Sequence, residues 1–182
     1  MRDAWSNDSN FLWMSLKNES LFDIHSHWDT LSFHVWARGR RIIGDPLSRA
    51  YGMLSGTDRG YYFSMDAHNC LIIDQDILTS YRALKRAYGK QPPRIDSAYT
   101  AFGEEEDYAS VSHDGYRPLI HRRDVLFVHG RYFIITDGIS MDFRGFNVVF
   151  DSTGDIRPHF YKQRLHFEEG IGVRVLKREG AL

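Results

Sequence analysis

The feature that most constrains the fold of this chain is a series of short apolar stretches separated by turn residues, which begins at Asp96. The clearest case is a pair of apolar runs at 125–128 and 132–135 that flank His129-Gly130-Arg131, a pattern that predicts a β-hairpin. We expect further strands at 148–150, 163–167 and 173–176. Repeated short strands are typical of all-β domains built from stacked antiparallel sheets. The chain has 182 residues and no internal repeat, so we expect one antiparallel β-sandwich domain over residues 1–182.

The N-terminal half carries the same kind of signal. Apolar stretches at 11–16 and 31–37 predict strands. In the second stretch the odd-numbered residues are apolar and share one face, while His34 and Trp36 share the other. This alternation predicts a strand with one face on the core.

The remaining elements are shorter. Gly39 allows a turn into 41–43, which predicts a second hairpin, and 70–73 reads as a short buried strand. Residues 45–66 contain several glycines and read as a long loop of the kind that often carries function. Apolar residues at helical spacing within 78–88 predict one short helix.

The composition excludes several classes of partner. The formal net charge of −1 gives no reason to expect nucleic acid or a membrane surface bound through bulk charge. We see no apolar run long enough to span a bilayer, and residues 1–10 lack the apolar region of a secretory signal. Cys70 is the single cysteine, which excludes an intramolecular disulfide. Aromatic residues make up 14% of the chain, which favours strands and also suits a surface that stacks against sugar rings.

Histidine and aspartate gather at three places next to predicted strands. His25, His27 and Asp29 alternate along the chain and would share one face of an extended strand. Asp45 lies in a Gly-Asp-Pro sequence, and His68 lies in Ala-His-Asn just before a buried strand. Zinc binds His nitrogens and Asp oxygens, and two histidines from one strand cannot close a tetrahedral site alone. His27, Asp45 and His68 could therefore converge from three adjacent strands, with ordinary hydrogen bonding at strand edges as the alternative.

Other polar residues near these motifs have simpler interpretations. Asn69 is expected to cap backbone groups at the start of a strand. Five histidines in the strand-rich half show no partner spacing, and we expect them to be ordinary surface or core residues: His113, His121, His129, His159 and His166.

Three motifs, taken in order, resemble the heparinase II/III-like polysaccharide lyases, a family that includes heparin, heparan and oligoalginate lyases. They are His25-Ser-His27-Trp-Asp29-Thr-Leu-Ser32-Phe33, Ile43-Gly-Asp45-Pro46 and Ala67-His68-Asn69. The opening from Arg2 to Asp8 is similar to the first strand of this domain in the family, and Asp124 to Asp137 resembles its paired strands that end in an aspartate. The likeness covers most of the chain and is weaker after Asp151.

The resemblance implies a supersandwich-like β-sandwich that follows an (α/α) toroid, with the active site in the cleft between the two. Members degrade uronic-acid polysaccharides by β-elimination, in which the uronate carboxylate is neutralised, a base removes the C5 proton and an acid protonates the leaving O4. We therefore expect a lyase domain for alginate-like or heparan-like glycans, with a toroid domain or chain as its partner. Because the relatives are mostly periplasmic, a periplasmic or secreted location is expected.

The resemblance also assigns roles to residues. The family's metal ligands fall on His27, Asp45 and His68, which implies Zn²⁺ or another divalent cation. His25 corresponds to a histidine that faces the substrate and takes part in catalysis. A loop tyrosine serves as acid or base in some members. Its candidates here are Tyr51, which follows Gly-Asp-Pro, and Tyr61 and Tyr62, which precede Ala-His-Asn. Such a tyrosine can act as acid or base only if neighbouring cations or the metal lower its pKa.

The sequence departs from the family pattern and leaves two other functions open. Leu47 replaces the glycine that usually follows Asp-Pro, and Met65-Asp66 replace a Ser/Thr-Thr pair. One alternative is a glycan-binding β-sandwich without catalysis. The other is a cupin-like metal-dependent oxygenase, which also places His-x-His on a β-sandwich strand. However, no Glu follows His27 at the cupin spacing.

Overall fold

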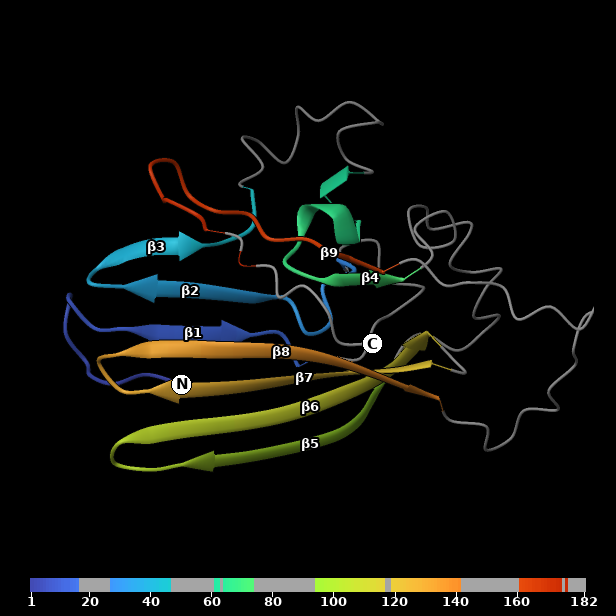
Figure 1. The fold of residues 1–182 in the computed structure, drawn as a ribbon, viewed down its shortest axis with the longest axis horizontal. Coiled ribbons are helices and arrows are strands. Elements are labelled where there is room, and N and C mark those ends of the chain that lie inside the picture. Colours follow the sequence, from blue (N-terminus) through green and yellow to red (C-terminus); the bar gives the residue numbers. More distant parts are fainter. Residues whose placement is uncertain are drawn as a thin grey trace, which may run out of the picture.

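The computed structural model describes residues 1–16, 27–46, 61–62, 64–73, 94–116, 119–141, 161–174 and 176, and these form an all-β fold of three antiparallel sheets (Figure 1). The first sheet contains β1 (Phe11–Met14), β2 (Phe33–Ala37) and β3 (Arg40–Ile43). The second pairs β4 (Leu71–Ile73) with β9 (Tyr161–Gln163). The third contains β5 (Ile95–Phe102), β6 (Glu106–Tyr116), β7 (Leu119–Val128) and β8 (Tyr132–Met141) in that order. A single 3-10 turn, η1 (Met65–Ala67), precedes β4.

Both predicted hairpins are confirmed. β7 and β8 pair in register from Val128↔Tyr132 onward, around a turn in which Gly130 has a φ of 65°. β2 and β3 are joined by Arg38 and Gly39, which both have positive φ, as a tight two-residue hairpin turn requires. A Cβ at Gly39 would lie 2.6 Å from the carbonyl oxygen of Asn7, so this position also needs glycine for space.

The first and third sheets pack against each other through the apolar faces of their strands. Phe33 and Val35 of β2 and Leu12 of β1 are buried against Val125 of β7. Partly buried residues of β8 complete this cluster, among them Phe133. The expected division of β2 into an apolar face and a face with His34 and Trp36 therefore holds, and the inner face anchors the sheet.

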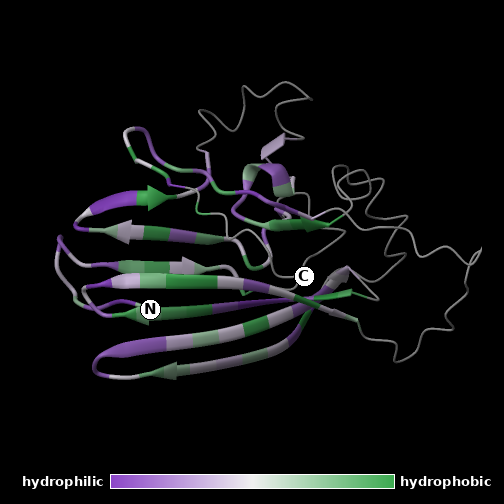
Figure 2. Ribbon diagram, viewed as in Figure 1, coloured by the Kyte–Doolittle hydropathy of each residue, from purple (hydrophilic) through white to green (hydrophobic). Residues whose placement is uncertain are grey.

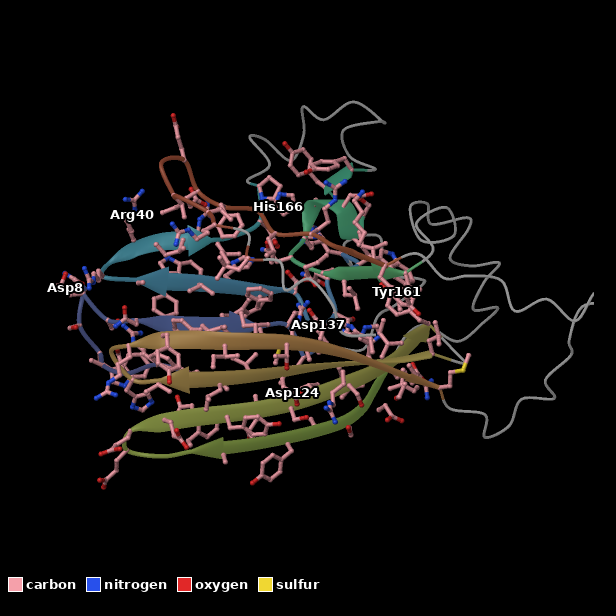
Figure 3. The ribbon with its side chains drawn as sticks, in the orientation of Figure 1. Asp8, Arg40, Asp124, Asp137, Tyr161 and His166 are labelled. Carbon is pink, nitrogen blue, oxygen red and sulfur yellow. The ribbon has the colours of Figure 1, made fainter. Side chains whose placement is uncertain are left out.

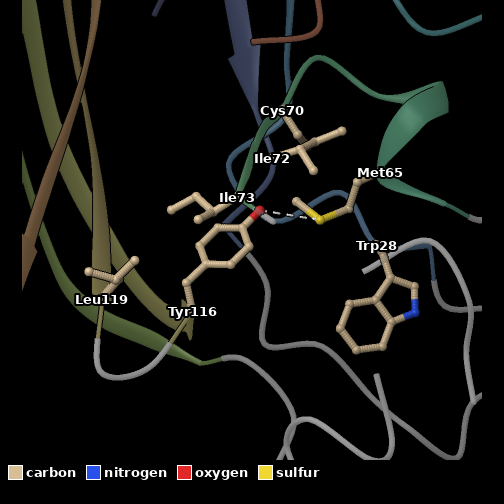
Figure 4. Packing of buried hydrophobic residues seen from close by; sticks show 7 residues of the cluster. All are labelled: Trp28, Met65, Cys70, Ile72, Ile73, Tyr116 and Leu119. Atoms are coloured by element: carbon tan, nitrogen blue, oxygen red, sulfur yellow. Dashed lines mark hydrogen bonds between the residues drawn. The ribbon is translucent and has the colours of Figure 1, made fainter. Parts of the chain in front are cut away.

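A second apolar cluster holds the β4 segment against the end of the β6–β7 hairpin (Figure 4). Ile72 and Ile73 of β4 pack near Tyr116 and Leu119, and Met65 of η1 closes the cluster. The Tyr116 hydroxyl donates to the main-chain oxygen of Leu71 at 2.6 Å. This packing fixes the turn that precedes β4.

Three predicted strands differ in the structure. The strand expected at 163–167 lies earlier in the chain, because β9 spans Tyr161–Gln163 and residues 164–166 are not in a strand. The strand expected to begin at Leu31 begins at Phe33, because Leu31 has a φ of 60° and lies in a turn. Val173, Arg174 and Leu176 are not in a strand. The expected strand at 148–150 and the expected helix at 78–88 lie outside the described residues.

The hydropathy of the strands shows that polar residues lie in the middle of β7. Figure 2 shows a hydrophilic stretch inside β7, between hydrophobic residues at its two ends. Arg123 lies in this stretch and is fully buried. Across the described residues, no helix has the length and apolar character needed to cross a membrane.

Candidate functional site

The structure brings the three prospective metal ligands together in one line, which we call the site triad (His27, His68 and Asp45). The His68 ring lies in the middle, with its Nδ1 at 2.7 Å from Asp45 Oδ2 and its Nε2 at 3.3 Å from His27 Nδ1. Because the carboxylate accepts the Nδ1 proton, Nε2 presents its lone pair toward His27.

The site triad is built from the ends of elements. His27 lies in the non-strand segment ahead of β2, Asp45 follows β3, and His68 follows η1. The expectation that these residues lie on three adjacent strands is therefore wrong. His27 and Asp29 are not in a strand, because the described chain from 27 to 32 runs through turns before β2 begins. Convergence is produced by the turns that the apolar clusters hold in place.

Asp45 is the electrostatic centre of the site. Its Oδ1 accepts a hydrogen bond from Asn69 Nδ2 at 3.1 Å, and its Oδ2 accepts from His68. His34 Nε2 lies 3.1 Å from the same Oδ2, an ion-pair distance without good hydrogen-bond alignment. Burial alone would raise the pKa of Asp45, but His34 and His68 outweigh it and hold the pKa well below its usual value. The carboxylate therefore stays charged and fixes the orientation of His68.

Asn69 holds the turns of the site together. It is fully buried, and its main-chain N–H donates to Ser32 Oγ at 3.1 Å. Its Oδ1 accepts the main-chain N–H of His166 at 2.7 Å, so it caps a backbone group as expected. His166 in turn accepts from Gly44 N–H through its carbonyl, and in Figure 3 it lies between β3 and η1. Asn69 thus connects the segments that carry Asp45 and His68.

The predicted catalytic residues are only partly described. His25 and Tyr51 lie outside the described residues. Tyr61 is partly exposed, and its carbonyl accepts hydrogen bonds from the N–H and Oγ of Ser64. Burial raises the pKa of the Tyr61 hydroxyl, Asp66 and Asp45 raise it further, and Arg164 lowers it. The hydroxyl therefore keeps its proton at neutral pH, and the described residues together do not lower its pKa as an acid or base role would require.

Sequence reasoning missed Arg123, a residue of β7 that holds the turns next to the site triad. Arg123 of β7 is fully buried and uses all its N–H groups. Two bond the carboxylate of Asp137 at 2.8 and 2.9 Å, and one bonds Gln163 Oε1 at 3.2 Å. The other two bond the carbonyls of Leu31 and Asn69. The guanidinium thereby links the third sheet to both turns that flank the site triad.

Next to Arg123 runs a second line of imidazoles, which we call the buried triad (His113, His121 and Asp137). His113 Nε2 lies 3.0 Å from His121 Nδ1, and His121 Nε2 lies 2.7 Å from Asp137 Oδ1. The main-chain N–H of Gly115 donates to His113 Nδ1 at 3.0 Å. These contacts give both rings a neutral tautomer with its proton on Nε2. The expectation of a core role holds for these histidines, but they have partners that the sequence spacing did not reveal.

The site triad fits a metal ion in part. In a tetrahedral zinc site with bonds of about 2.0–2.1 Å, two ligand nitrogens lie about 3.3 Å apart. The distance between His27 Nδ1 and His68 Nε2 is 3.3 Å. Asp45 lies on the far nitrogen of His68, where a carboxylate orients a metal-bound imidazole. Within the described residues, no three His, Cys, Asp or Glu side chains surround one point.

Comparison with known proteins places these residues in a family. The sequence matches the family described as heparinase II/III-like, C-terminal, over residues 8–181. No curated protein matches the chain. Among solved structures, a heparinase III gene product is similar with a TM-score of 0.59 and 20% identity, over 77% of this chain and 20% of that one.

Two further solved structures give the same result. The heparan sulfate lyase HepC from Pedobacter heparinus has a TM-score of 0.59 and 19% identity, over 77% of this chain and 20% of that chain. Another heparinase III structure has a TM-score of 0.56 and 22% identity, over 75% and 20% of the two chains. At these identities the likeness establishes the fold, and this chain covers 20% of the length of each of these proteins.

Proposed function

The chain belongs to the heparinase II/III-like C-terminal family, and on that basis we propose that it is the β-sandwich part of a polysaccharide lyase. Its substrates are uronic-acid-containing glycans of the alginate or heparan type, cleaved by β-elimination with support from a divalent cation. The observation that carries this proposal is the approach of His27 Nδ1 and His68 Nε2 to 3.3 Å, with Asp45 on the outer nitrogen of His68. The two imidazole nitrogens would supply two of the ligands of a zinc site, and the carboxylate would orient one of them.

The proposed reaction breaks the C5–H and C4–O4 bonds of the uronate, forms a C4=C5 double bond and leaves a proton on O4. When bound at the site triad, a divalent cation supplies positive charge that favours the build-up of negative charge on the uronate. Tyr61 remains a candidate for the acid that protonates O4, and its partly exposed hydroxyl keeps its proton at neutral pH. His25 and Tyr51 remain the candidates for removal of the C5 proton.

The proposal includes a partner and a location. The group that neutralises the uronate carboxylate is assigned to an (α/α) toroid domain or chain, which would face the site triad across a cleft. On the basis of its family, we assign the protein to the periplasm or the extracellular medium.

The test measures the ultraviolet absorbance of the unsaturated uronate product, with alginate and heparan oligomers as substrates. Product is expected when the chain is combined with a toroid partner chain. If product fails to form with the partner and without it, the lyase proposal is wrong and a glycan-binding module without catalysis is favoured instead.

Metal analysis tests the site independently of turnover. The wild-type chain is expected to bind zinc, and His68→Ala is expected to lose it. His129→Ala is the matched control, because His129 lies in the β7–β8 turn and bonds the carbonyl of Glu104, away from the site triad. Equal zinc content in the wild type and His68→Ala would remove His68 from the site.

A further inference from the structure

The outer face of the first sheet carries a cluster of rings next to the site triad. β1 and β2 place Phe11 opposite Trp36 and Trp13 opposite His34, all on the face that points away from the buried core. We call these four residues, together with Arg2 and Trp5, the aromatic face. An aromatic face of this size on one side of a short sheet exceeds the scattered apolar residues that are normal on protein surfaces.

The rings form two rows across the sheet. In the first row, Phe11 and Trp36 are stacked with centroids 4.5 Å apart and planes 9° apart. The Arg2 guanidinium extends this row, at 5.3 Å from the Phe11 ring and 4.3 Å from the Trp5 ring.

In the second row, Trp13 and His34 meet edge to face at 5.2 Å. The two rows are separated by two strand residues, which is about 6.8 Å. His34 and Trp36 join them at 5.7 Å.

The aromatic face is continuous with the site triad through His34. The same ring that meets Trp13 and Trp36 places its Nε2 3.1 Å from Asp45 Oδ2. A molecule bound at the site triad would therefore extend over Trp13 without leaving the protein surface. Trp13 is 49% exposed and Trp5 is 91% exposed, so ring surface is available along this direction.

The chemistry of the face fits an acidic sugar chain. Sugar rings present C–H groups on their flat faces, which pack on indole and phenyl rings, while indole N–H groups can bond sugar hydroxyls. A guanidinium recognises carboxylate or sulfate groups through paired N–H groups. Arg2 bonds the Ala4 carbonyl and Ser9 Oγ and makes no ion pair with an acidic side chain in the described part of the chain, so its charge is available.

We propose that the aromatic face binds the part of an acidic oligosaccharide that extends beyond the residue held at the site triad. This inference rests on the proposed function and adds a subsite to it. The face holds the sugar chain by stacking on Trp13, and Arg2 with Trp5 contacts an anionic group further along. By this proposal the face adds to the binding of longer oligomers more than to the binding of a single sugar unit at the site triad.

The experiment measures binding of size-defined alginate and heparan oligomers to the full chain by calorimetry, with disaccharides and hexasaccharides compared. The wild type is expected to bind hexasaccharides more tightly than disaccharides. Trp13→Ala is expected to weaken hexasaccharide binding about tenfold and to leave disaccharide binding unchanged. Trp13→Phe, which keeps a ring, is expected to recover most of the loss.

Matched controls separate binding from folding. Tyr99→Ala removes an exposed aromatic residue from β5 in the third sheet, and it is expected to leave all affinities unchanged. Thermal unfolding shows whether each variant is folded. Zinc content is measured on the same samples, and Trp13→Ala is expected to retain the wild-type value.

Three results would overturn the inference. Equal hexasaccharide affinity in the wild type and Trp13→Ala would exclude a role for the face, and so would the absence of any preference for longer oligomers. Loss of oligomer binding when a toroid chain is added, with Trp13 protected by that chain, would identify the face as a protein interface. The proposed function is tested by different measurements: it would fail if the chain bound no zinc or if no unsaturated product formed.

Discussion

The site triad and the buried triad are two His–His–Asp lines with nearly the same dimensions. The His–Asp distance is 2.7 Å in both, and the His–His distances are 3.3 and 3.0 Å. Their surroundings differ in two respects. Gly115 N–H caps the outer imidazole of the buried triad, and Arg123 neutralises its carboxylate. In the site triad, the partners of the carboxylate are imidazole, amide and hydroxyl groups, and no guanidinium contacts Asp45 within the described residues.

This difference decides which line can accept a cation. In the buried triad the N–H of Gly115 holds the His113 proton on Nε2, so the space between the two rings is filled by an N–H. The adjacent guanidinium would also repel a second positive charge. In the site triad no N–H caps the outer imidazole among the described contacts, and the partners of Asp45 are His34, His68, Asn69 and Ser32 rather than a guanidinium. Residue types alone therefore do not define a metal site, and the groups around them do.

The largest effect is expected from breaking the buried triad's ion pair. Arg123→Met leaves the Asp137 carboxylate buried without its guanidinium, and removing one partner of a buried pair costs about 3–5 kcal/mol. Urea unfolding of the variant measures this loss. The same variant should also lower zinc affinity, because the Asn69 and Leu31 carbonyls lose their common donor. A variant as stable as the wild type would show that the network is dispensable.

A smaller effect on the free energy of unfolding is expected from a change in pH, and it should come from the histidines of the buried triad. Burial lowers the pKa of His113 and His121, so these rings stay neutral in the folded protein where the unfolded chain, with a pKa of 6.5, takes up protons. The free energy of unfolding should therefore be highest above pH 6.5 and fall as the pH drops below it.

Asp137 adds a second window at lower pH. Burial alone would raise its pKa, but hydrogen bonds from His121 and Arg123 hold the pKa at about 2, below the ordinary 3.8. Its contribution is present above pH 3.8 and is lost as the pH falls toward 2. Urea titrations from pH 8 to pH 2 measure both windows, with His113→Gln as the variant expected to flatten the first. A flat profile from pH 8 to pH 5 in the wild type would contradict this account.

Substitutions of Asp45 and Asp137 are expected to have different effects on zinc affinity. Asp45→Asn weakens the acceptor that orients His68, and loss of such an orienting partner lowers metal affinity about 10–100-fold. Asp137→Asn should leave zinc affinity near the wild-type value while it lowers stability. Competition with a zinc-binding dye measures both variants. If Asp137→Asn lowered zinc affinity as much as Asp45→Asn, the distinction between the two triads would be lost.

The smallest effect is expected at a pair of buried serines. Ser32→Ala removes the acceptor of the Asn69 N–H and should cost about 1–3 kcal/mol of stability, with a modest loss of zinc affinity. Ser112→Ala, which removes hydrogen bonds to Ser97 and Asp96, should cost a similar amount of stability and leave zinc binding unchanged. Unfolding and zinc titration of both variants compare them directly. Equal zinc affinity in the two would show that the Ser32 bond does not support the site.

The fold was largely predictable because its signals are local. The β7–β8 hairpin follows from two apolar runs around Gly130, and the β2–β3 hairpin follows from Gly39. The alternation in β2 gave its two faces correctly. The turn at Leu31 could not be seen, because a buried leucine beside an apolar strand reads as part of that strand and its positive φ has no sequence signature.

The residues of the site triad were predictable from the sequence, but Arg123, which holds the neighbouring turns, was not. Motif order brought His27, Asp45 and His68 into one hypothesis, and the structure shows them in contact. Arg123 was missed because a charged residue in a strand reads as solvent-facing, while its partners lie 92 and 54 positions away at Leu31 and Asn69. Long-range pairing of this kind carries no periodic signal in the chain.

Arg123 bonds carbonyl groups that lie far from it in the sequence, and this affects when the site forms during synthesis. During synthesis the N-terminal turns emerge first, but the guanidinium that anchors their carbonyls is translated only after most of the sandwich, and Gln163 follows later still. The nascent chain therefore carries the histidines of the site before it can hold them in place. On the proposed function, the cation should load late, after Gln163 has been translated and has bonded Arg123.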